Sequence, residues 1–294
     1  MLFYFLGDDK YKSGVRFKVF ATFRCNLSAI SLFCGVLVLS ACAKEDVVLE
    51  NVEMYDKKLW VFERSFVPVA LGLPQAEIVD NVSSVMPVYI EGDGRGWVTR
   101  KKISDDPTPS FSLVLRLMQK DNRPSVYMAR PCMYHLNDSC HSNYWTDARH
   151  AVELVGVMNN ALDEVKQMYD VSRFELIGHS GGGAMAVLMA AKRQDISQIV
   201  TVAANLDVAY FTDIHHVSEM KGSLDPIDFA HQVSHIPQLH LVGGDDDVIP
   251  YKLVERYVHQ SQSPCVRSKL MKGFTHLKGW VDVWPNVAQL NHDC

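Results

Sequence analysis

The stretch "FELIGHSGGGA" (174–184) places a single serine, Ser180, among glycines at the junction of two expected elements. The residues before it are typical of a short buried strand, and the small residues after it begin a helical pattern. A strand that turns this sharply into a helix strains its central residue and crowds the positions two before and two after it. Gly178 and Gly182 stand at those positions, where the missing Cβ removes the clash. We therefore predict that Ser180 is a nucleophile on a tight turn, rather than an idle serine in a glycine-rich loop.

Short β-branched runs alternate with helical patterns on both sides of this turn. Strands are expected at 85–92, 125–130, 174–178, 197–204, 237–244 and 268–273, and helices near 108–121, 151–168 and 250–260. In the first of these helices, Thr108 is the expected N-cap and Pro109 the first helical residue. This alternation predicts an α/β fold, with a mostly parallel, doubly wound sheet and helices on both faces. One domain over 58–294 is expected, with a small cap insertion at about 205–236.

A serine nucleophile needs a base, and the base needs an orienting group. At such a turn the acid follows the serine in the chain, and the histidine follows the acid. The acid candidates are Asp245, Asp246 and Asp247 in "HLVGGDDDVIP" (240–250), which stand where a parallel sheet places its active site. The residues alone do not choose among the three. The base candidate is His276, in the loop after the last expected strand.

These segments resemble the α/β-hydrolase superfamily over roughly 58–290. "GHSGGG" looks like its nucleophile elbow, "GFTH" like the loop that carries its histidine, and "GGDDDVIP" like its segment with the acid four residues before the proline. The resemblance selects Asp246 and implies a Ser180, His276 and Asp246 triad on a sheet of the α/β-hydrolase type. The wider pattern is similar to uncharacterised proteobacterial α/β-hydrolase lipoproteins.

The expected oxyanion hole departs from the family. The family often has His-Gly after its third strand, where this chain has Glu91-Gly92-Asp93-Gly94. Backbone N–H groups make the hole, so by position we predict Gly181 and Asp93 as the donors. An inward carboxylate would oppose the oxyanion, so we expect the Asp93 side chain to point away or to pair with Arg95 or another basic residue.

The first forty residues carry a basic stretch and then an apolar run that ends in "LSAC" (39–42). The run is shorter than the roughly 18 apolar residues of a membrane span and suits a secretory signal. The segment resembles a bacterial lipobox, which implies a signal over 1–41, lipidation of Cys42 and a tether over 42–57. The alternatives are a signal anchor, or a plain signal in which Cys42 is incidental. Attachment to the cell envelope is expected, with the outer membrane facing the periplasm as its site.

Four cysteines remain after removal of the signal and use of Cys42, in a compartment that permits disulfides. Cys132 and Cys140 are the expected first pair, with Cys265 and Cys294 as the second, although four cysteines allow three pairings. No spacing among them is typical of a zinc site. Four tryptophans are interpreted as packing or pocket wall rather than a sugar platform: Trp97, Trp145, Trp280 and Trp284.

The sequence as a whole predicts an envelope-anchored serine hydrolase that acts through an acyl-enzyme, most simply a carboxylic ester hydrolase. An amide or peptide hydrolase or an acyltransferase would use the same triad, and a non-catalytic binding lipoprotein is the alternative from another class. No metal or organic cofactor is implied, and the expected partners are an acyl substrate and, through the lipid, a membrane. The net charge of -5 gives no general attraction to nucleic acid.

Overall fold

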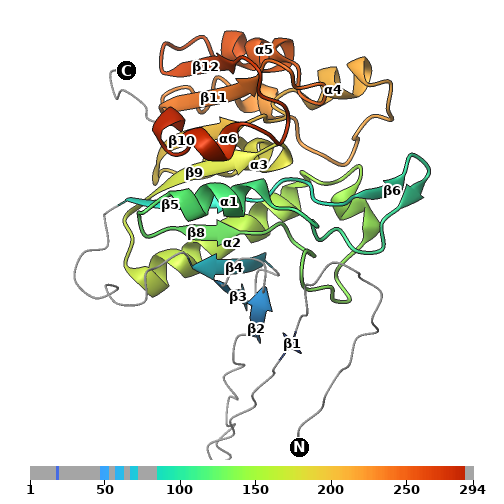
Figure 1. Cartoon of the computed structure of the whole chain (residues 1–294), viewed down its shortest axis with the longest axis vertical. Coiled ribbons are helices and arrows are strands. Elements are labelled where there is room, and N and C mark those ends of the chain that lie inside the picture. The colour runs from blue at the N-terminus through green and yellow to red at the C-terminus, as the bar shows by residue number, and fades with distance from the viewer. Residues whose placement is uncertain (1–17, 20–46, 53–56, 63–66, 72–84, 289–294) are drawn as a thin grey trace, which may run out of the picture.

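The computed structural model describes residues 18–19, 47–52, 57–62, 67–71 and 85–288 (Figure 1). Its centre is a sheet with the strand order β1-β2-β3-β4-β8-β5-β9-β10-β11-β12. Six neighbouring strands of this sheet are parallel. They are β8 (Val126–Met128), β5 (Val85–Ile90), β9 (Arg173–His179), β10 (Ile196–Val202), β11 (Gln238–Gly243) and β12 (Val266–Met271). The predicted α/β class and mostly parallel sheet are therefore confirmed.

An antiparallel ribbon extends the sheet beyond β8. It consists of β1 (Lys18–Val19), β2 (Val47–Val52), β3 (Lys57–Phe62) and β4 (Val67–Leu71), and β4 pairs with β8. Residues 42–57 were predicted as a tether, yet β2 lies inside that range and is paired with β3. The sheet therefore takes in part of the expected tether.

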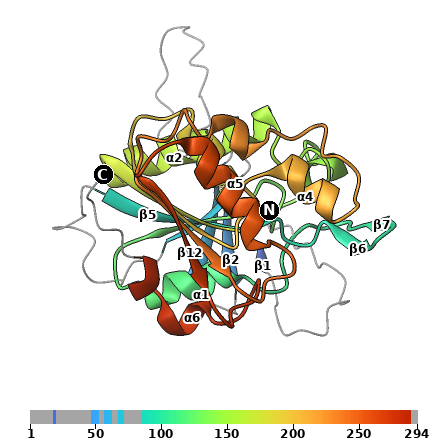
Figure 2. The same ribbon diagram turned by 90° about the horizontal axis from the view of Figure 1, so that it is seen from above.

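Helices cover both faces of the sheet, as Figure 2 shows from above. One core lies between the sheet and the helices α2 (Val152–Tyr169), α3 (Gly181–Ala190) and α5 (Tyr251–Ser261). The second core lies on the other face, under α1 (Leu113–Lys120) and α6 (Trp280–Val283). The apolar runs of the central strands are buried because both of their faces are covered, which is the usual arrangement of a parallel sheet.

The start of α1 differs from the prediction. The helix begins at Leu113, and the Ser112 hydroxyl accepts a hydrogen bond from the Leu115 N–H at 3.1 Å as the N-cap. Thr108 instead accepts a hydrogen bond from the Tyr134 N–H at 2.7 Å. Two competent capping residues stand close together in the chain, and only the tertiary contact of Thr108 distinguishes them.

The expected cap insertion contains α4 (Val208–Ile214) and a 3₁₀ turn at Pro226–Phe229. Asp207 caps α4 by accepting from the Tyr210 N–H, and the Asp225 carboxylate accepts from Val208 and Ala209 at the same helix end. His215, which follows α4, bonds through Nε2 to the carbonyl oxygen of Val248 at 2.8 Å. This insertion between β10 and β11 is thus hydrogen-bonded to the loop after β11, at the edge of the sheet where its parallel strands end.

Candidate active site

Ser180 lies between the end of β9 and the first residue of α3. Its φ of 53° and ψ of -122° are unusual for a residue with a side chain and indicate backbone strain. A Cβ at Gly178 would lie 2.3 Å from the carbonyl oxygen of Gly182, and a Cβ at Gly182 would lie 2.4 Å from that of Ile90. The two glycines therefore allow three stretches of backbone to meet at this turn.

Backbone hydrogen bonds hold the turn in place. The Ser180 N–H donates to the carbonyl of Val202 at the end of β10, at 3.0 Å. The Ser180 carbonyl accepts from Gly183 at 3.0 Å and from Asn205 at 3.3 Å. The strained conformation of Ser180 is thus fixed by the helix it begins and by the neighbouring strand.

The structure brings Asp246 and His276 together from two different loops. His276 Nδ1 lies 3.0 Å from Asp246 Oδ2, and Asp246 Oδ1 accepts from the N–H groups of Val248 and Ile249, each at 2.9 Å. Burial raises the pKa of the Asp246 carboxyl, but these hydrogen bonds outweigh burial and hold the pKa below its usual value. Asp246 is therefore an anion, and its hydrogen bond favours the His276 tautomer that carries its proton on Nδ1 and a lone pair on Nε2.

The two neighbouring aspartates lie differently. Asp245 and Asp247 are exposed, whereas Asp246 is buried. The Asp245 N–H donates to the carbonyl of Phe274 at 2.9 Å, which ties the Asp246 loop to the His276 loop through the backbone. The structure therefore places only the middle aspartate of the three against the histidine.

His179, the residue before Ser180, was not among the predicted site residues. Its Nε2–H donates to the backbone carbonyl of His276 at 3.0 Å, and the two rings are 4.8 Å apart. Burial, together with the nearby His276, lowers the pKa of His179 to about 3, so the ring is neutral near pH 7. A histidine at the end of an expected buried strand, directly before the nucleophile, was the sequence feature that could have indicated this contact.

The loop after β5 lies directly against the turn. The Gly92 N–H is already used, because it donates to Glu91 Oε1 at 3.0 Å. Gly181 opens α3, so its N–H has no partner within the helix. Within the described part of the chain, no hydrogen bond uses the Asp93 N–H or the Gly181 N–H. These two groups are therefore available to an oxyanion.

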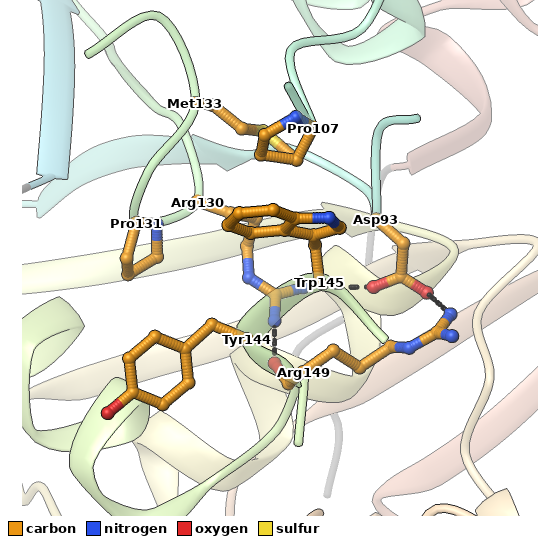
Figure 3. A pocket seen from close by; sticks show the side chains of 8 residues that line it. All are labelled: Asp93, Pro107, Arg130, Pro131, Met133, Tyr144, Trp145 and Arg149. Carbon is orange, nitrogen blue, oxygen red and sulfur yellow. Dashed lines mark hydrogen bonds and ion pairs between the residues drawn. The ribbon is translucent and has the colours of Figure 1, made fainter. Parts of the chain in front are cut away.

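The Asp93 carboxylate is held by two arginines (Figure 3). Arg149 lies 2.8 Å from Oδ2 and Arg130 lies 3.2 Å from Oδ1. Arg130 also donates to the backbone carbonyl of Arg149. Burial raises the pKa of the Asp93 carboxyl, but the charges of Arg149 and Arg130 outweigh burial and lower that pKa well below its usual range. Burial lowers the pKa of His150 to about 3, so this ring adds no charge to the cluster near pH 7. Burial also lowers the pKa of Arg130, and the Asp93 carboxylate opposes that shift.

Two arrangements of the Asp93 side chain are expected: it points away from the turn, or it pairs with a basic residue. The structure does not show the first. A Cβ on Gly181 would lie within 2.6 Å of three Asp93 side-chain atoms. The carboxylate therefore packs on the backbone of Gly181, and the second expectation, pairing with a basic residue, is the one that holds. Arg130 and Arg149 are the partners, and both come from segments distant in the sequence.

The remaining predicted residues are placed as follows. The Cys132–Cys140 disulfide is present, as predicted. Cys265 forms no disulfide with a described residue, and its expected partner Cys294 lies outside the described residues, as does Cys42. The described ranges contain no group of His, Cys, Asp and Glu side chains suited to a metal ion. Among the helices described, none has the length and apolar character needed to cross a bilayer.

We compared the sequence and the structure with known proteins. No protein-family model and no curated protein matches the sequence. Solved structures do match: Est1E from Butyrivibrio proteoclasticus has 15% identity and a TM-score of 0.50, and the match covers 81% of this chain and 93% of that one. Puromycin hydrolase has 14% identity and a TM-score of 0.53, over 76% of this chain and 34% of that chain.

The acylaminoacyl peptidase of Pyrococcus horikoshii is a third neighbour. It has 13% identity and a TM-score of 0.50, and the match covers 79% of this chain and 37% of that chain. At these identities the likeness concerns the fold. The chain has the fold of the α/β-hydrolase superfamily, as its sequence predicted.

The crowding at the turn can be tested with two glycines of opposite surroundings. We expect Gly178→Ala to destabilise the protein by more than about 3 kcal/mol, or to prevent folding, because the new Cβ would meet backbone that cannot move aside. Gly156→Ala is the control, since Gly156 is exposed in α2 and a Cβ there meets nothing. It should stabilise the protein by about 0.5–1 kcal/mol. Thermal unfolding followed by circular dichroism measures both, and equal stability of the two variants would contradict the account of the turn.

Proposed function

We propose that the protein is a serine hydrolase that cleaves carboxylic esters through an acyl-enzyme. The observation that carries the proposal is the Asp246–His276 hydrogen bond, formed beside a strained serine whose neighbouring N–H groups are available. His179 joins the histidine loop to the turn, because it precedes Ser180 and bonds to the carbonyl of His276. This arrangement matches the functional order of a nucleophile, a base and an orienting acid.

The chemistry follows from these positions. Ser180 Oγ attacks the acyl carbonyl carbon while its proton passes to His276 Nε2. Asp246 stabilises the imidazolium and keeps the ring oriented. The tetrahedral intermediate carries its negative charge against the N–H groups of Gly181 and Asp93. The intermediate collapses as His276 gives the proton to the leaving alcohol, and water then repeats the sequence on the acyl-enzyme.

The arginine pair supports the oxyanion in two ways. Arg130 and Arg149 fix the Asp93 carboxylate, and so the backbone that carries the Asp93 N–H. They also supply two positive charges against the one negative charge of Asp93, so the carboxylate does not oppose the developing oxyanion. Charge that is fixed before the reaction begins stabilises a transition state without a cost of rearrangement.

Exposed apolar residues that neighbour the candidate site along the chain favour an apolar acyl group. Leu277 directly follows His276 and is 45% exposed, and Val248 follows Asp246 by two residues and is 36% exposed. Val217 is 51% exposed and lies two residues after His215, which bonds to the carbonyl of Val248. Exposed apolar residues on loops that also carry the candidate site are suited to contact with substrate.

Amide or peptide hydrolysis is the second candidate, since two structural neighbours are named as a puromycin hydrolase and an acylaminoacyl peptidase. An acyltransferase would differ only in the group that receives the acyl chain, and a binding lipoprotein would have the fold without turnover. A panel of p-nitrophenyl esters of rising chain length beside aminoacyl amides separates ester from amide preference. Labelling by a fluorophosphonate separates the enzymes from the binding protein.

The triad assignment predicts unequal effects along the aspartate run. We expect Asp246→Asn to lower kcat/KM for a p-nitrophenyl ester by a factor of about 10⁴, because the histidine loses the partner that sets its tautomer. Asp245→Asn and Asp247→Asn are matched controls on the exposed neighbours and should retain activity within about twofold. Ser180→Ala should abolish fluorophosphonate labelling in a folded protein. Equal losses at all three aspartates, or labelling of the alanine variant, would overturn the assignment.

The arginine clamp predicts a loss of turnover. We expect Arg149→Met to lower kcat about tenfold with a smaller change in KM, since loss of a whole oxyanion donor costs about 10²–10³ and this variant only loosens one. Arg149→Lys should recover part of the loss. Arg116→Met, on the exposed side of α1, is the control and should leave kcat unchanged. A normal kcat in a folded Arg149→Met protein would remove the arginine from this role.

We also propose that the protein is anchored to the cell envelope by lipid on Cys42. The support is the order of basic stretch, apolar run and "LSAC" in the sequence. Cys42→Ser, expressed with its own leader, should leave the membrane fraction after a high-salt wash, because salt removes attachment by surface charge but not by inserted acyl chains. Mass spectrometry of the wild-type N-terminal peptide should show the lipid. A variant that stays with the washed membranes would favour the signal anchor.

A further inference from the structure

A short hairpin projects from the body of the molecule beside the candidate site. It consists of β6 (Trp97–Thr99) and β7 (Lys102–Ile103), which pair antiparallel around a turn at Arg100 and Lys101. Figures 1 and 2 both show it extending away from the sheet, on the side where α4 lies. Its first strand begins four residues after Asp93, in the loop that follows β5.

The base of the hairpin is firmly held. The Ser104 N–H donates to the carbonyl of Gly96 at 3.0 Å, and the Trp145 indole donates to the carbonyl of Ser104 at 3.0 Å. A Cβ on Gly96 would lie 2.4 Å from the carbonyl oxygen of Trp145, so the hairpin base sits directly on that backbone. The Arg95 N–H donates to Pro107 at 2.8 Å. The hairpin is therefore a fixed projection, and its exposed residues stay exposed.

The tip combines apolar and cationic side chains. Trp97 is 45% exposed and Val98 is 41% exposed, whereas the tryptophans at 145, 280 and 284 are buried. Of the four tryptophans interpreted as packing or pocket wall, those three are packing residues, and Trp97 is the exposed one. The tip also carries three exposed cations, Arg100, Lys101 and Lys102. None of the three forms an ion pair with an acidic side chain among the described residues. Asp105 and Asp106 lie beyond Ser104, at the base.

We propose that this hairpin docks the protein on an anionic lipid surface. An indole ring is stable at the boundary between water and acyl chains, and Val98 adds apolar area beside it. Lysine and arginine next to such a surface are attracted to acidic headgroups. The protein as a whole has a net charge of -5, so a cationic tip joined to exposed apolar side chains directs one region of it toward a negative surface.

Docking through this hairpin would orient the candidate site. The hairpin and Asp93 belong to one loop at the end of β5, and the structure holds both ends of that loop. A lipid surface that touches Trp97 therefore lies near the edge of the sheet that carries Ser180 and His276. This inference goes beyond the proposed reaction and depends on neither the triad nor the lipid on Cys42.

The fluorescence of Trp97 can be used to test the proposal. The full chain is mixed with vesicles of phosphatidylcholine and phosphatidylglycerol whose acyl chains carry bromine, which quenches tryptophan on contact. We expect quenching in the wild type and its loss in Trp97→Phe, since the difference between the two isolates this side chain whatever else binds the vesicle. Vesicles of phosphatidylcholine alone should give little quenching. Equal quenching in the two proteins would mean that Trp97 stays in water, and the proposal would fail.

Charge reversal at the tip provides the second arm. Arg100→Glu, Lys101→Glu and Lys102→Glu together should raise the anionic lipid needed for half-maximal quenching by about tenfold or more. The control changes the same net charge elsewhere, as Lys120→Glu, Lys192→Glu and Lys269→Glu, three exposed positions away from the hairpin. Equal effects of the two triple variants would assign the binding to net charge and overturn the proposal. Binding of the tip to RNA or to a protein without quenching by lipid would overturn it as well.

Hydrolysis of a soluble p-nitrophenyl ester serves as the folding control. Trp97→Phe and both triple variants should retain wild-type turnover, because none of these side chains touches the candidate site. Loss of quenching with retained turnover supports the docking surface. If no protein in the set hydrolyses the ester, the proposed reaction fails while the quenching comparison still decides the docking surface.

Discussion

The close backbone contact around Ser180 is the constraint on which the rest of the site depends. Gly182 packs against the end of β5, and Gly178 packs against the start of α3, at distances that leave no room for a Cβ. The end of β5 continues directly into the loop that carries the candidate oxyanion donor. Contact at the turn therefore fixes the serine relative to that loop, and a Cβ on Gly92 would lie 3.6 Å from the Cβ of Ser180.

A second set of contacts holds the acid and the base next to the turn that carries Ser180. β11 and β12 pair in parallel, so the loops that follow them leave the sheet side by side. The bond from Asp245 to Phe274 joins these loops, and His179 joins the second loop to the turn. The Asp246–His276 hydrogen bond therefore joins two loops that other hydrogen bonds already hold together.

Charged side chains in the loop after β5 and packed against it form two zones. At its start, Arg130 and Arg149 more than balance the Asp93 carboxylate, in a position close to the backbone of Gly181. Further along, the hairpin exposes three cations and Trp97 to solvent. The buried end of this segment carries the proposed oxyanion donor, and its exposed end carries the proposed contact with lipid. The hydrogen bonds of Ser104 lie between the two ends and hold the base of the hairpin.

The sequence by itself determined the α/β class and the place of the turn, because these depend on local patterns: alternation of strands and helices, and glycines at crowded positions. It predicted the Cys132–Cys140 pair from a separation of eight residues, and the structure selects that pair from the possible pairings. The family pattern selected Asp246, and the structure places that residue against His276. The partners of Asp93, the contact between His179 and His276, and the exposure of Trp97 came only from the tertiary structure. The first two depend on segments distant in the chain that meet when the sheet forms, and no local pattern of residue types shows which distant side chain will fill a given space. The third depends on where the hairpin stands relative to the folded body, which the pairing of β6 with β7 does not decide.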